Sequence, residues 1–328
     1  MKKIGIIGCG NIARVHGWAI RELENAELSV VCDIVEKRAV EISENYAAEK
    51  QCSVETYWRK LLETDIDVVH ICTPHFLHVP MAVEFLKAGK AVFMEKPCSI
   101  STYQFEQLQE ADYNFPNHLG ICFQNRYNYS TKVAMQLTNS GEIGNITGAR
   151  AFVTWRRDEE YYNGSPWKGQ LDKEGGGVLI NQAIHTLDLM LEFLGKPEKV
   201  EASIHNHHLK NISVEDTVEA WMSFPDGKRA CFYASNGYAA DAPVILELQG
   251  ETGIITIYGN EVRLKKFGQD TEVFSEKEDL GISKEYWGTG HKKCISDFYR
   301  SLEEGTAFKI NLESVKNTFE VMMKIYNR

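Results

Sequence analysis

Residues 2–24, KKIGIIGCGNIARVHGWAIRELE, decide the fold of the first half of the chain. A short apolar run leads through the glycine-rich turn GCGNIA into a segment whose apolar residues Ile12, Val15 and Ala19 follow helical spacing. A buried strand that runs through glycines into a helix is typical of the first unit of a parallel α/β sheet. The stretch therefore predicts a strand, a tight turn and a helix, in that order.

The same alternation continues to about residue 122. The strand-like runs are LSVVCD, DVVHICTP, AVFMEKP and LGICFQ, and the helix-like runs are EKRAVEISENYA, VPMAVEFLKAG and TYQFEQLQEADY. Strands that alternate with helices predict βαβ units and a doubly wound parallel sheet. We therefore expect an α/β fold whose first domain, residues 1–122, is a dinucleotide-binding Rossmann domain.

The GCGNIA turn has the composition of a phosphate-binding loop. Gly8 allows the sharp turn at the end of the strand, and Gly10 lets the backbone approach a pyrophosphate. Asn11 and Ile12 open the helix, where free N–H groups and the helix dipole attract phosphates. A plain glycine turn is the alternative, because the motif alone is weak evidence.

Asp33 ends the second predicted strand, where a carboxylate accepts hydrogen bonds from the adenosine ribose. A carboxylate there repels a 2′-phosphate, so the sequence favours NAD over NADP as the cofactor. Lys37 and Arg38 follow closely and weaken this preference. If the turn binds no nucleotide, Asp33 is an ordinary surface residue.

Two more loops fall at the carboxyl ends of predicted strands, where open α/β sheets bind ligands. The expected cofactor contacts in these loops are Thr73, Pro74, His75, His78, Glu95 and Lys96. Lys96 follows a buried strand in the motif EKP and is expected to point into the crevice. The alternative is a solvated loop lysine.

From residue 123 onward the pattern changes to strand-like runs joined by short turns. The runs are TGARAFVTW, TVEAWMSF, RACFYAS, VILELQG, GIITIYG and EVRLKKF, and helices are expected near 291–304 and 313–326. In TVEAWMSF, Val218 and Met222 alternate with polar residues and Trp221, so one face of the sheet is buried and the other open. We expect residues 123–328 to form an α+β domain with a large, mostly antiparallel, open-faced sheet.

The stretch GGGVLINQAIHTLDLM, residues 175–190, places polar side chains on one side of an apolar helix. At about 100° per residue, Asn181, His185 and Asp188 fall within a narrow arc, which fits either a solvated helix face or part of a reaction centre. The preceding segment, which includes Tyr162, is rich in Trp, Tyr and Arg, residues that stack on and hydrogen-bond to sugars. A surface loop is the alternative for that segment.

Composition argues against several classes of protein. The 328 residues carry a formal net charge of −10, which disfavours a general nucleic-acid or membrane-surface binder because both partners are polyanionic. No apolar run approaches the roughly 20 residues needed to span a bilayer. The eight cysteines form no C-x-x-C pair, and HNHH at 205–208 fits a loop better than a metal cluster, so neither a metal site nor a disulfide framework is expected. The reducing cytoplasm is the expected compartment.

GIIGCGNIA, HICTPHFLH, VFMEKP and GGGVLINQAIHTLDL together resemble the Gfo/Idh/MocA family of NAD(P)-dependent sugar and cyclitol oxidoreductases, over nearly the whole chain. The resemblance implies that Lys96 lies in the active site, often before a cis peptide, and that His185 is the acid–base residue. It places Asn181 where the family often has aspartate. It also places near the cofactor Gln124, Trp167 and Lys168, the last with lysine where arginine is common.

The resemblance leads to one expected function and two alternatives. We expect a dehydrogenase that transfers a hydride between NAD(P) and a secondary hydroxyl or ketone of a sugar, cyclitol or derivative. The expected substrate contacts are Lys96, Asn181, His185 and Tyr162, with Tyr286 and His291 as weaker candidates. A homodimer or homotetramer is expected to form through the open sheet face. The alternatives are a regulatory relative that binds NAD and sugar without turnover, and an NAD-dependent glycosidase of the same fold.

Overall fold

The computed structural model describes residues 1–47, 52–276 and 289–328, and Tyr286 lies outside them. The described residues form two compact units. Unit 1 consists of the described residues up to Gln124 together with Thr289–Val315, and unit 2 of residues 125–276 together with Lys316–Arg328. No described helix has the length and apolar character that crossing a membrane requires.

Unit 1 is built on a six-stranded sheet in which neighbouring strands pair in parallel. The strands are β1 Lys2–Ile7, β2 Ala26–Cys32, β3 Ser53–Glu55, β4 Val68–Ile71, β5 Ala91–Glu95 and β6 Leu119–Cys122. Their order, β3-β2-β1-β4-β5-β6, is that of a Rossmann fold and confirms the prediction from the alternating pattern. β4, β5 and β6 are buried throughout, which explains their nearly continuous apolar runs.

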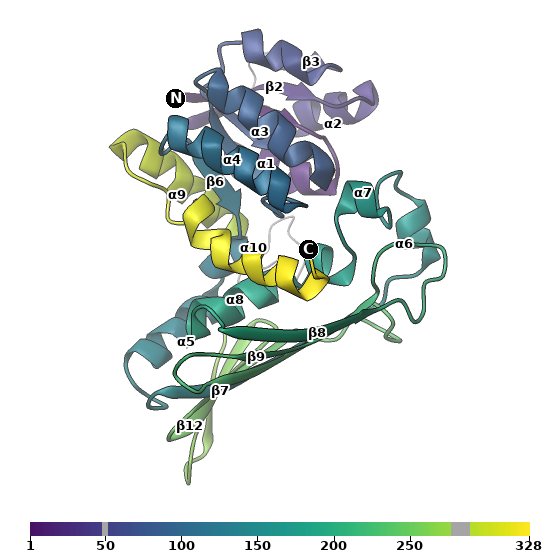
Figure 1. The fold of residues 1–328 in the computed structure, drawn as a ribbon. Helices are drawn as coiled ribbons and strands as arrows, with labels where there is room; N and C mark the ends of the chain where they lie inside the picture. The colour runs from purple at the N-terminus through teal and green to yellow at the C-terminus, as the bar shows by residue number, and fades with distance from the viewer. Residues whose placement is uncertain (48–51, 277–288) are drawn as a thin grey trace. The chain divides into compact units, whose positions relative to one another are not determined.

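Helices connect the parallel strands and form two layers. They are α1 Asn11–Arg21, α2 Glu36–Tyr46, α3 His78–Lys87, α4 Thr102–Asn114 and α9 Gly290–Glu304, with the short 3-10 turns η1 Trp58–Glu63 and η2 His75–Leu77. The sheet grows from β1 to β2 in one direction and from β4 to β5 in the other, so right-handed connections place α1 and α3 on opposite faces. α1 contacts α2 and α9, whereas α3 contacts α4 (Figure 1).

The late segment Thr289–Val315 belongs to unit 1, whereas the sequence pattern placed it in a second domain of residues 123–328. The Ile121 amide of β6 donates to the Ile310 carbonyl at 2.9 Å. Phe298 of α9 packs against Gly120, where a Cβ atom would lie 2.7 Å from the aromatic ring. The missing side chain at Gly120 thus lets a late helix cover the edge strand β6.

Unit 2 contains an eight-stranded sheet in the order β14-β13-β12-β11-β7-β10-β9-β8. The strands are β7 Ile146–Thr154, β8 Lys199–His205, β9 Thr217–Ser223, β10 Arg229–Ser235, β11 Ile245–Gly250, β12 Gly253–Tyr258, β13 Glu261–Lys266 and β14 Thr271–Phe274. β7 and β10 pair in parallel, and the other neighbours are antiparallel. The prediction of a large, mostly antiparallel sheet is therefore confirmed.

The polar helix expected around residues 175–190 consists of two segments. Leu179–Ala183 forms a π-helical turn, η4, and Ile184–Leu194 continues as the α-helix α8. A π turn adds one residue to a helical turn and is frequent at functional sites. The remaining helices are η3 Gln124–Tyr127, α5 Tyr129–Asn139, α6 Glu159–Asn163, α7 Leu171–Glu174 and α10 Leu312–Tyr326.

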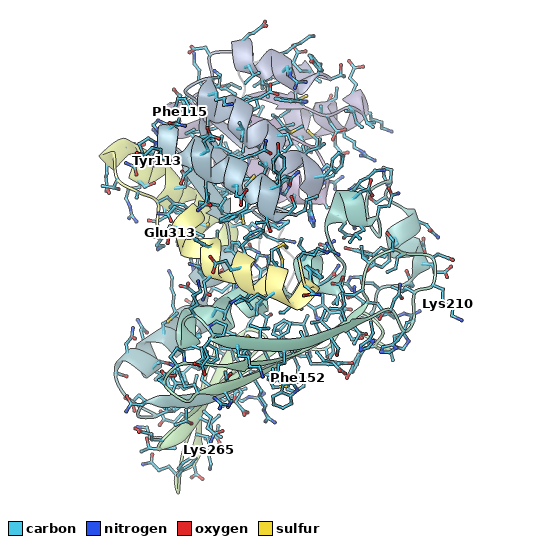
Figure 2. All side chains as sticks on the ribbon, in the orientation of Figure 1. Tyr113, Phe115, Phe152, Lys210, Lys265 and Glu313 are labelled. Carbon is cyan, nitrogen blue, oxygen red and sulfur yellow. The ribbon has the colours of Figure 1, made fainter. Side chains whose placement is uncertain are left out.

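One face of the unit 2 sheet is covered by α5 and α8, which contact β12 and β7 respectively. Val218 and Met222 of β9 are at most 2% exposed, whereas Trp221 between them is 63% exposed. This difference confirms the predicted alternation. Phe152 of β7 pairs with Tyr233 of β10 on the open face, and Figure 2 shows Phe152 on the side of the sheet away from α5 and α8.

Candidate active site

The glycine turn between β1 and α1 fits a bound phosphate group. Gly8 has φ +86°, and a Cβ atom there would lie 2.7 Å from the Cys72 carbonyl oxygen, so this position requires glycine. Gly10 is the N-cap of α1, and no described heavy atom lies within 4 Å of its Cβ position. The first amides of α1, at Asn11 and Ile12, therefore have no side-chain cap in the described structure and begin beside open space. Such a helix start binds anions.

Asp33 follows β2 beside this turn, with a largely buried carboxylate. Its Oδ2 accepts a hydrogen bond from the Cys9 amide and its Oδ1 accepts one from the Val35 amide, each at 2.8 Å. A carboxylate offers about four lone-pair positions, so these two bonds leave acceptor capacity for ribose hydroxyls. The next residue, Ile34, is 89% exposed and offers an apolar surface where an adenine ring could stack. The sequence analysis did not single out Ile34, although an apolar residue directly after Asp33 was the available signal.

The two loops at the ends of β4 and β5 are tied together by His78. Its Nε2 lies 2.9 Å from the Thr73 carbonyl and its Nδ1 lies 3.0 Å from the Pro97 carbonyl. Both ring nitrogens thus face protein groups and join the two loops, and the cofactor contact of His78 stays a prediction. The Lys96–Pro97 peptide bond is cis, as the resemblance implies. Thr73, Pro74 and Lys96 are half-buried, and His75 is buried beside His78.

A chain of buried polar side chains runs through unit 1 from Glu95 to Tyr299. His16 Nε2 lies 2.9 Å from Glu95 Oε1, and His16 Nδ1 lies 2.8 Å from His70 Nδ1. His70 Nε2 lies 2.7 Å from the Tyr299 hydroxyl. His16, His70 and Tyr299 are fully buried. His16 is therefore part of the core of unit 1.

The pKa values of this chain indicate an ionised pair. Burial lowers the pKa of His16, but hydrogen bonds with Cys122 and Glu95 and the charge of Glu95 outweigh it and raise the pKa to about 9. Burial opposes ionisation of Glu95, yet the hydrogen bond and charge of His16 hold its pKa well below the usual range. Burial and the His16 charge lower the pKa of His70, which therefore stays neutral. His16 then donates to both neighbours, and His70 donates its remaining N–H to Tyr299.

His16, Glu95 and Cys122 also bring potential metal-ligand atoms within 4.8 Å of one another. Sequence spacing gave no sign of this cluster, because its members come from α1, β5 and β6. The cluster already forms an internal pair, since His16 and Glu95 hydrogen-bond to each other. We therefore describe it as an ion pair beside a thiol.

Two more expected site residues of unit 1 are almost fully buried. Gln124 is 2% exposed, with its Oε1 3.9 Å from Cys122 Sγ. His291 is also 2% exposed, and the centres of its ring and the His16 ring are 6.2 Å apart. Burial lowers the pKa of His291 to about 4, so this imidazole is neutral at physiological pH.

In unit 2, two close neighbours leave no room for a side chain in the glycine run before η4. A Cβ atom on Gly176 would overlap the Tyr326 hydroxyl, and one on Gly177 would overlap the Glu215 carbonyl oxygen. The Glu215 carboxylate also accepts from the Gly177 amide at 2.8 Å and from the Tyr326 hydroxyl at 2.9 Å. Packing within unit 2 thus accounts for the glycine run.

The arc of polar residues on η4 and α8 is not a solvated face. Asp188 is 1% exposed and accepts two hydrogen bonds from the Arg126 guanidinium, at 2.6 and 2.7 Å. Thr318 donates a third, at 2.8 Å. Asn181 and His185 are half-buried. The alternative of a wet helix face is therefore wrong for Asp188, whose partner comes from a distant part of the sequence.

Glu174, the last residue of α7, is a buried carboxyl group that the sequence analysis missed. It is 0% exposed, and its oxygens accept from the Gly169 amide and from Asn181 Nδ2, each at 2.5 Å. Burial raises its pKa to about 7, against the opposing effects of these hydrogen bonds and of the Lys168 charge, and the charge of Glu215 raises it further. An acidic residue directly before the glycine run was the available signal.

Tyr162, an expected substrate contact, lies in the interior of unit 2. It is 4% exposed, and its hydroxyl accepts from Asn236 Nδ2 at 3.0 Å. The adjacent Tyr161 is half-buried, with Lys168 Nζ 3.6 Å from its ring centre and Asn181 Nδ2 3.5 Å from its hydroxyl. The substrate contact of Tyr162 stays a prediction, and Tyr161, to which no sequence motif pointed, lies beside Lys168 and Asn181.

The candidate site residues are divided between the two units. Unit 1 holds Gly8, Gly10, Asn11, Ile12, Asp33, Thr73, Pro74, His75, His78, Glu95, Lys96 and Gln124. Unit 2 holds Tyr161, Trp167, Lys168, Glu174, Asn181 and His185. Trp167 is half-buried in the loop before α7.

Two family models match the chain. The model of the oxidoreductase family with an NAD-binding Rossmann fold, GFO/IDH/MocA, matches residues 2–113, and the GFO/IDH/MocA C-terminal domain matches residues 131–256. The chain belongs to the Gfo/Idh/MocA family. The resemblance expected from the sequence motifs is therefore confirmed.

Relatives of this Gfo/Idh/MocA protein include dehydrogenases of cyclitols and sugars. It is 25% identical to inositol 2-dehydrogenase of Rhizobium meliloti, over 77% of this chain and 74% of that protein. It is 28% identical to D-glucoside 3-dehydrogenase of Escherichia coli, over 65% of this chain and 59% of that protein. A crystal structure of the WlbA dehydrogenase from Chromobacterium violaceum, in complex with NADH and UDP-GlcNAcA, matches with a TM-score of 0.86 and 26% identity, over 99% of this chain and 93% of that one.

Proposed function

We propose that the protein is an NAD-dependent dehydrogenase or reductase that acts on a secondary hydroxyl or ketone of a sugar, cyclitol or sugar derivative. The observation that carries this proposal is the phosphate-binding turn at Gly8 and Gly10 with the Asp33 carboxylate beside it, in a Gfo/Idh/MocA chain. The names of the inositol and glucoside dehydrogenases support the substrate class.

The residues around the turn fit NAD better than NADP. The amides at the start of α1 would hold the pyrophosphate, Asp33 the ribose hydroxyls, and Ile34 one face of the adenine. Glu36, the first residue of α2, adds an exposed negative charge three residues after Asp33 and further disfavours a 2′-phosphate. When bound, the nicotinamide accepts or donates the hydride, and the protein supplies orientation and electrostatics.

We assign the proton chemistry to His185 and the binding of the reacting oxygen to Lys96. His185 is half-buried on α8, and an imidazole suits general base catalysis because it titrates near neutral pH. Lys96 follows β5 at the end of the parallel sheet, where its ammonium group would stabilise negative charge on the substrate oxygen. Tyr161 and Asn181 would orient the sugar hydroxyls.

The same proposal assigns roles to the two units. Unit 1 would bind the dinucleotide, and unit 2 would bind the substrate and form a homodimer or homotetramer through the open face of its sheet. All eight cysteines lie in the described residues as free thiols, which fits the reducing cytoplasm. Nucleic acid and membranes are not expected partners at a net charge of −10.

The first experiment is a titration with NADH and NADPH followed by tryptophan fluorescence, and then NADH absorbance across a panel of sugars, cyclitols and sugar nucleotides. We expect tighter binding of NADH and turnover of at least one panel member. Replacing His185 with alanine should lower the hydride-transfer rate roughly 100- to 10,000-fold, because the general base is lost. The dissociation constant for NADH should stay the same.

The two alternatives give different results in the same assays. A regulatory relative would bind NADH tightly and turn over no panel member. A glycosidase would release the aryl group from aryl glycosides without net NADH production. A His185→Ala variant with full turnover would remove His185 from the mechanism.

A further inference from the structure

Buried Glu174 and half-buried Asn181 form a hydrogen-bonded pair next to the helix that carries His185. Glu174 is completely buried, and its Oε1 accepts from Asn181 Nδ2 at 2.5 Å. Its second oxygen accepts from the Gly169 amide, also at 2.5 Å. Both carboxylate oxygens therefore have a donor inside unit 2, and one of these donors is a candidate substrate contact.

This contact fixes which way the Asn181 amide points. An ionised carboxylate only accepts hydrogen bonds, so Asn181 must turn its NH2 group toward Glu174. The Tyr161 hydroxyl, 3.5 Å from the same Asn181 nitrogen and 3.0 Å from Gln182 Nε2, lies on the donor side as well. Asn181 thus presents its carbonyl oxygen, an acceptor, on the other side of the amide.

We propose that Glu174 is a positioning residue of the reaction, which holds the Asn181 side chain so that an acceptor oxygen is presented four residues before His185. This inference rests on the proposed function, because it concerns the same reaction. In this chain the negative charge that a carboxylate at position 181 would supply comes instead from Glu174, through the polarised amide of Asn181. In this proposal Glu174 acts through Asn181.

Burial opposes the carboxylate form of Glu174, whereas hydrogen bonds from the Gly169 amide and Asn181 favour it. Burial raises its pKa to about 7, and Lys168 favours the charged form while Glu215 opposes it. Lys168 is also held over the Tyr161 ring, at 3.6 Å from its centre. The Glu174 carboxyl is thus partly ionised near neutral pH and ionised at higher pH. A neutral imidazole base also works in this pH range.

The test is an exchange of the acid and the amide between the two positions. In Glu174→Gln, the Gly169 amide holds the glutamine oxygen, so the glutamine NH2 group faces Asn181 and turns the Asn181 oxygen inward. Asn181→Asp leaves two carboxylates in contact, which share one proton because both cannot ionise at that distance. In the double variant, the glutamine oxygen accepts from the Gly169 amide and its NH2 donates to the aspartate, so the geometry is kept with the charge at position 181.

We expect each single variant to lose roughly 10- to 100-fold in kcat/KM, because misplaced groups cost about this much. The kcat/KM of the double variant should recover to within about fivefold of the wild type. Such a recovery would mean that the effects of the two substitutions are strongly coupled, as expected for residues in contact. The matched control is Glu215→Gln, a second buried carboxyl of unit 2, which accepts from the Gly177 amide and the Tyr326 hydroxyl. Asn181→Asp should not restore activity to that variant. NADH affinity should be equal in the wild type and the Glu174 and Asn181 variants.

The outcomes separate this inference from the proposed function. Suppose that the wild type turns over a substrate but the double variant is no more active than Glu174→Gln. This result would overturn the positioning role and leave the proposed function intact. A fully active Glu174→Gln variant would do the same. Tight NADH binding by a wild type that turns over nothing would overturn the proposed function, and the positioning role with it. Recovery of activity only in the double variant would support the proposal. If Glu174 only stabilised the fold, Asn181→Asp would not restore the activity of Glu174→Gln.

Discussion

The His16–Glu95 ion pair is buried, so its contribution to stability depends on the protonation of both groups. The fold raises the pKa of His16 from 6.5 to about 9. The resulting stabilisation is complete below pH 6.5 and is lost as the pH rises through 9. A shift of this size is worth roughly 3 kcal/mol in the free energy of unfolding. We expect urea unfolding to show a loss of about this size between pH 6.5 and 9.

The control for this prediction is the double variant His16→Gln/Glu95→Gln, which removes both charges and keeps polar groups in place. Removing one partner alone would leave a buried, unpaired charge and confuse the comparison. The double variant should unfold with a free energy that changes little from pH 6.5 to 9. Parallel curves for the wild type and the double variant would show that His16 is not charged in the native state.

Among the elements, the two glycine turns should respond to alanine in opposite ways. Gly177→Ala places a methyl group on the Glu215 carbonyl oxygen, so we expect a loss of at least about 3 kcal/mol in the free energy of unfolding. Gly10→Ala meets no described atom within 4 Å, so stability should stay within about 0.5 kcal/mol of the wild type. Its methyl group would occupy the approach to the α1 amides, and we expect NADH affinity to fall at least about tenfold.

Denaturation curves and NADH titrations of both variants decide this prediction. A stable Gly177→Ala variant would mean that the segment around Glu215 can shift. An unchanged NADH affinity in Gly10→Ala would mean that the pyrophosphate does not approach this turn. The two glycines are thus distinguished by what surrounds them, although the sequence shows only short glycine-rich turns in both places.

The predicted elements were those whose pattern is local. The strand–turn–helix at residues 2–24 and the alternation in β9 were predicted correctly, because each depends on neighbours in sequence. The edge strands β8 and β14 were missed, since most of their residues are exposed and carry little apolar pattern. Thr289–Val315 could not be assigned to unit 1 either, because its hydrogen bond to Ile121 joins segments far apart in the chain.

The residues of the candidate site, like the elements of the fold, could be predicted only where the sequence pattern is local. Motifs indicated Gly8, Gly10 and Asp33, whose roles follow from their position after a strand. No motif indicated Glu174, because its buried contacts with the Gly169 amide and Asn181 form only in the folded chain. Contacts that form only on folding, rather than residue types, therefore decide which acidic groups near the glycine run are functional candidates.

For the whole molecule, the open face of the unit 2 sheet has the composition of an interface between two copies. Trp221 is 63% exposed and Val273 56%, and Phe152 and Tyr233 pack together on the same face. Two ion pairs form within this face, Arg150 with Glu247 at 2.8 Å and Arg263 with Glu261 at 3.0 Å. Aromatic residues with few unpaired charges are typical of the core of a homodimer interface.

We expect the protein in solution to have a mass two or four times that of the 37.3 kDa chain, measured by light scattering after gel filtration. Trp221→Glu should reduce this mass, because burying an unpaired carboxylate in a symmetric interface is costly in both copies. Tyr113→Glu is the matched control, since Tyr113 is an 87% exposed aromatic residue on α4 of unit 1. NADH binding should survive in both variants, because neither residue lies near the glycine turn in sequence or belongs to its candidate contacts. A monomeric wild type, or a Trp221→Glu variant of unchanged mass, would show that the open face is not the interface.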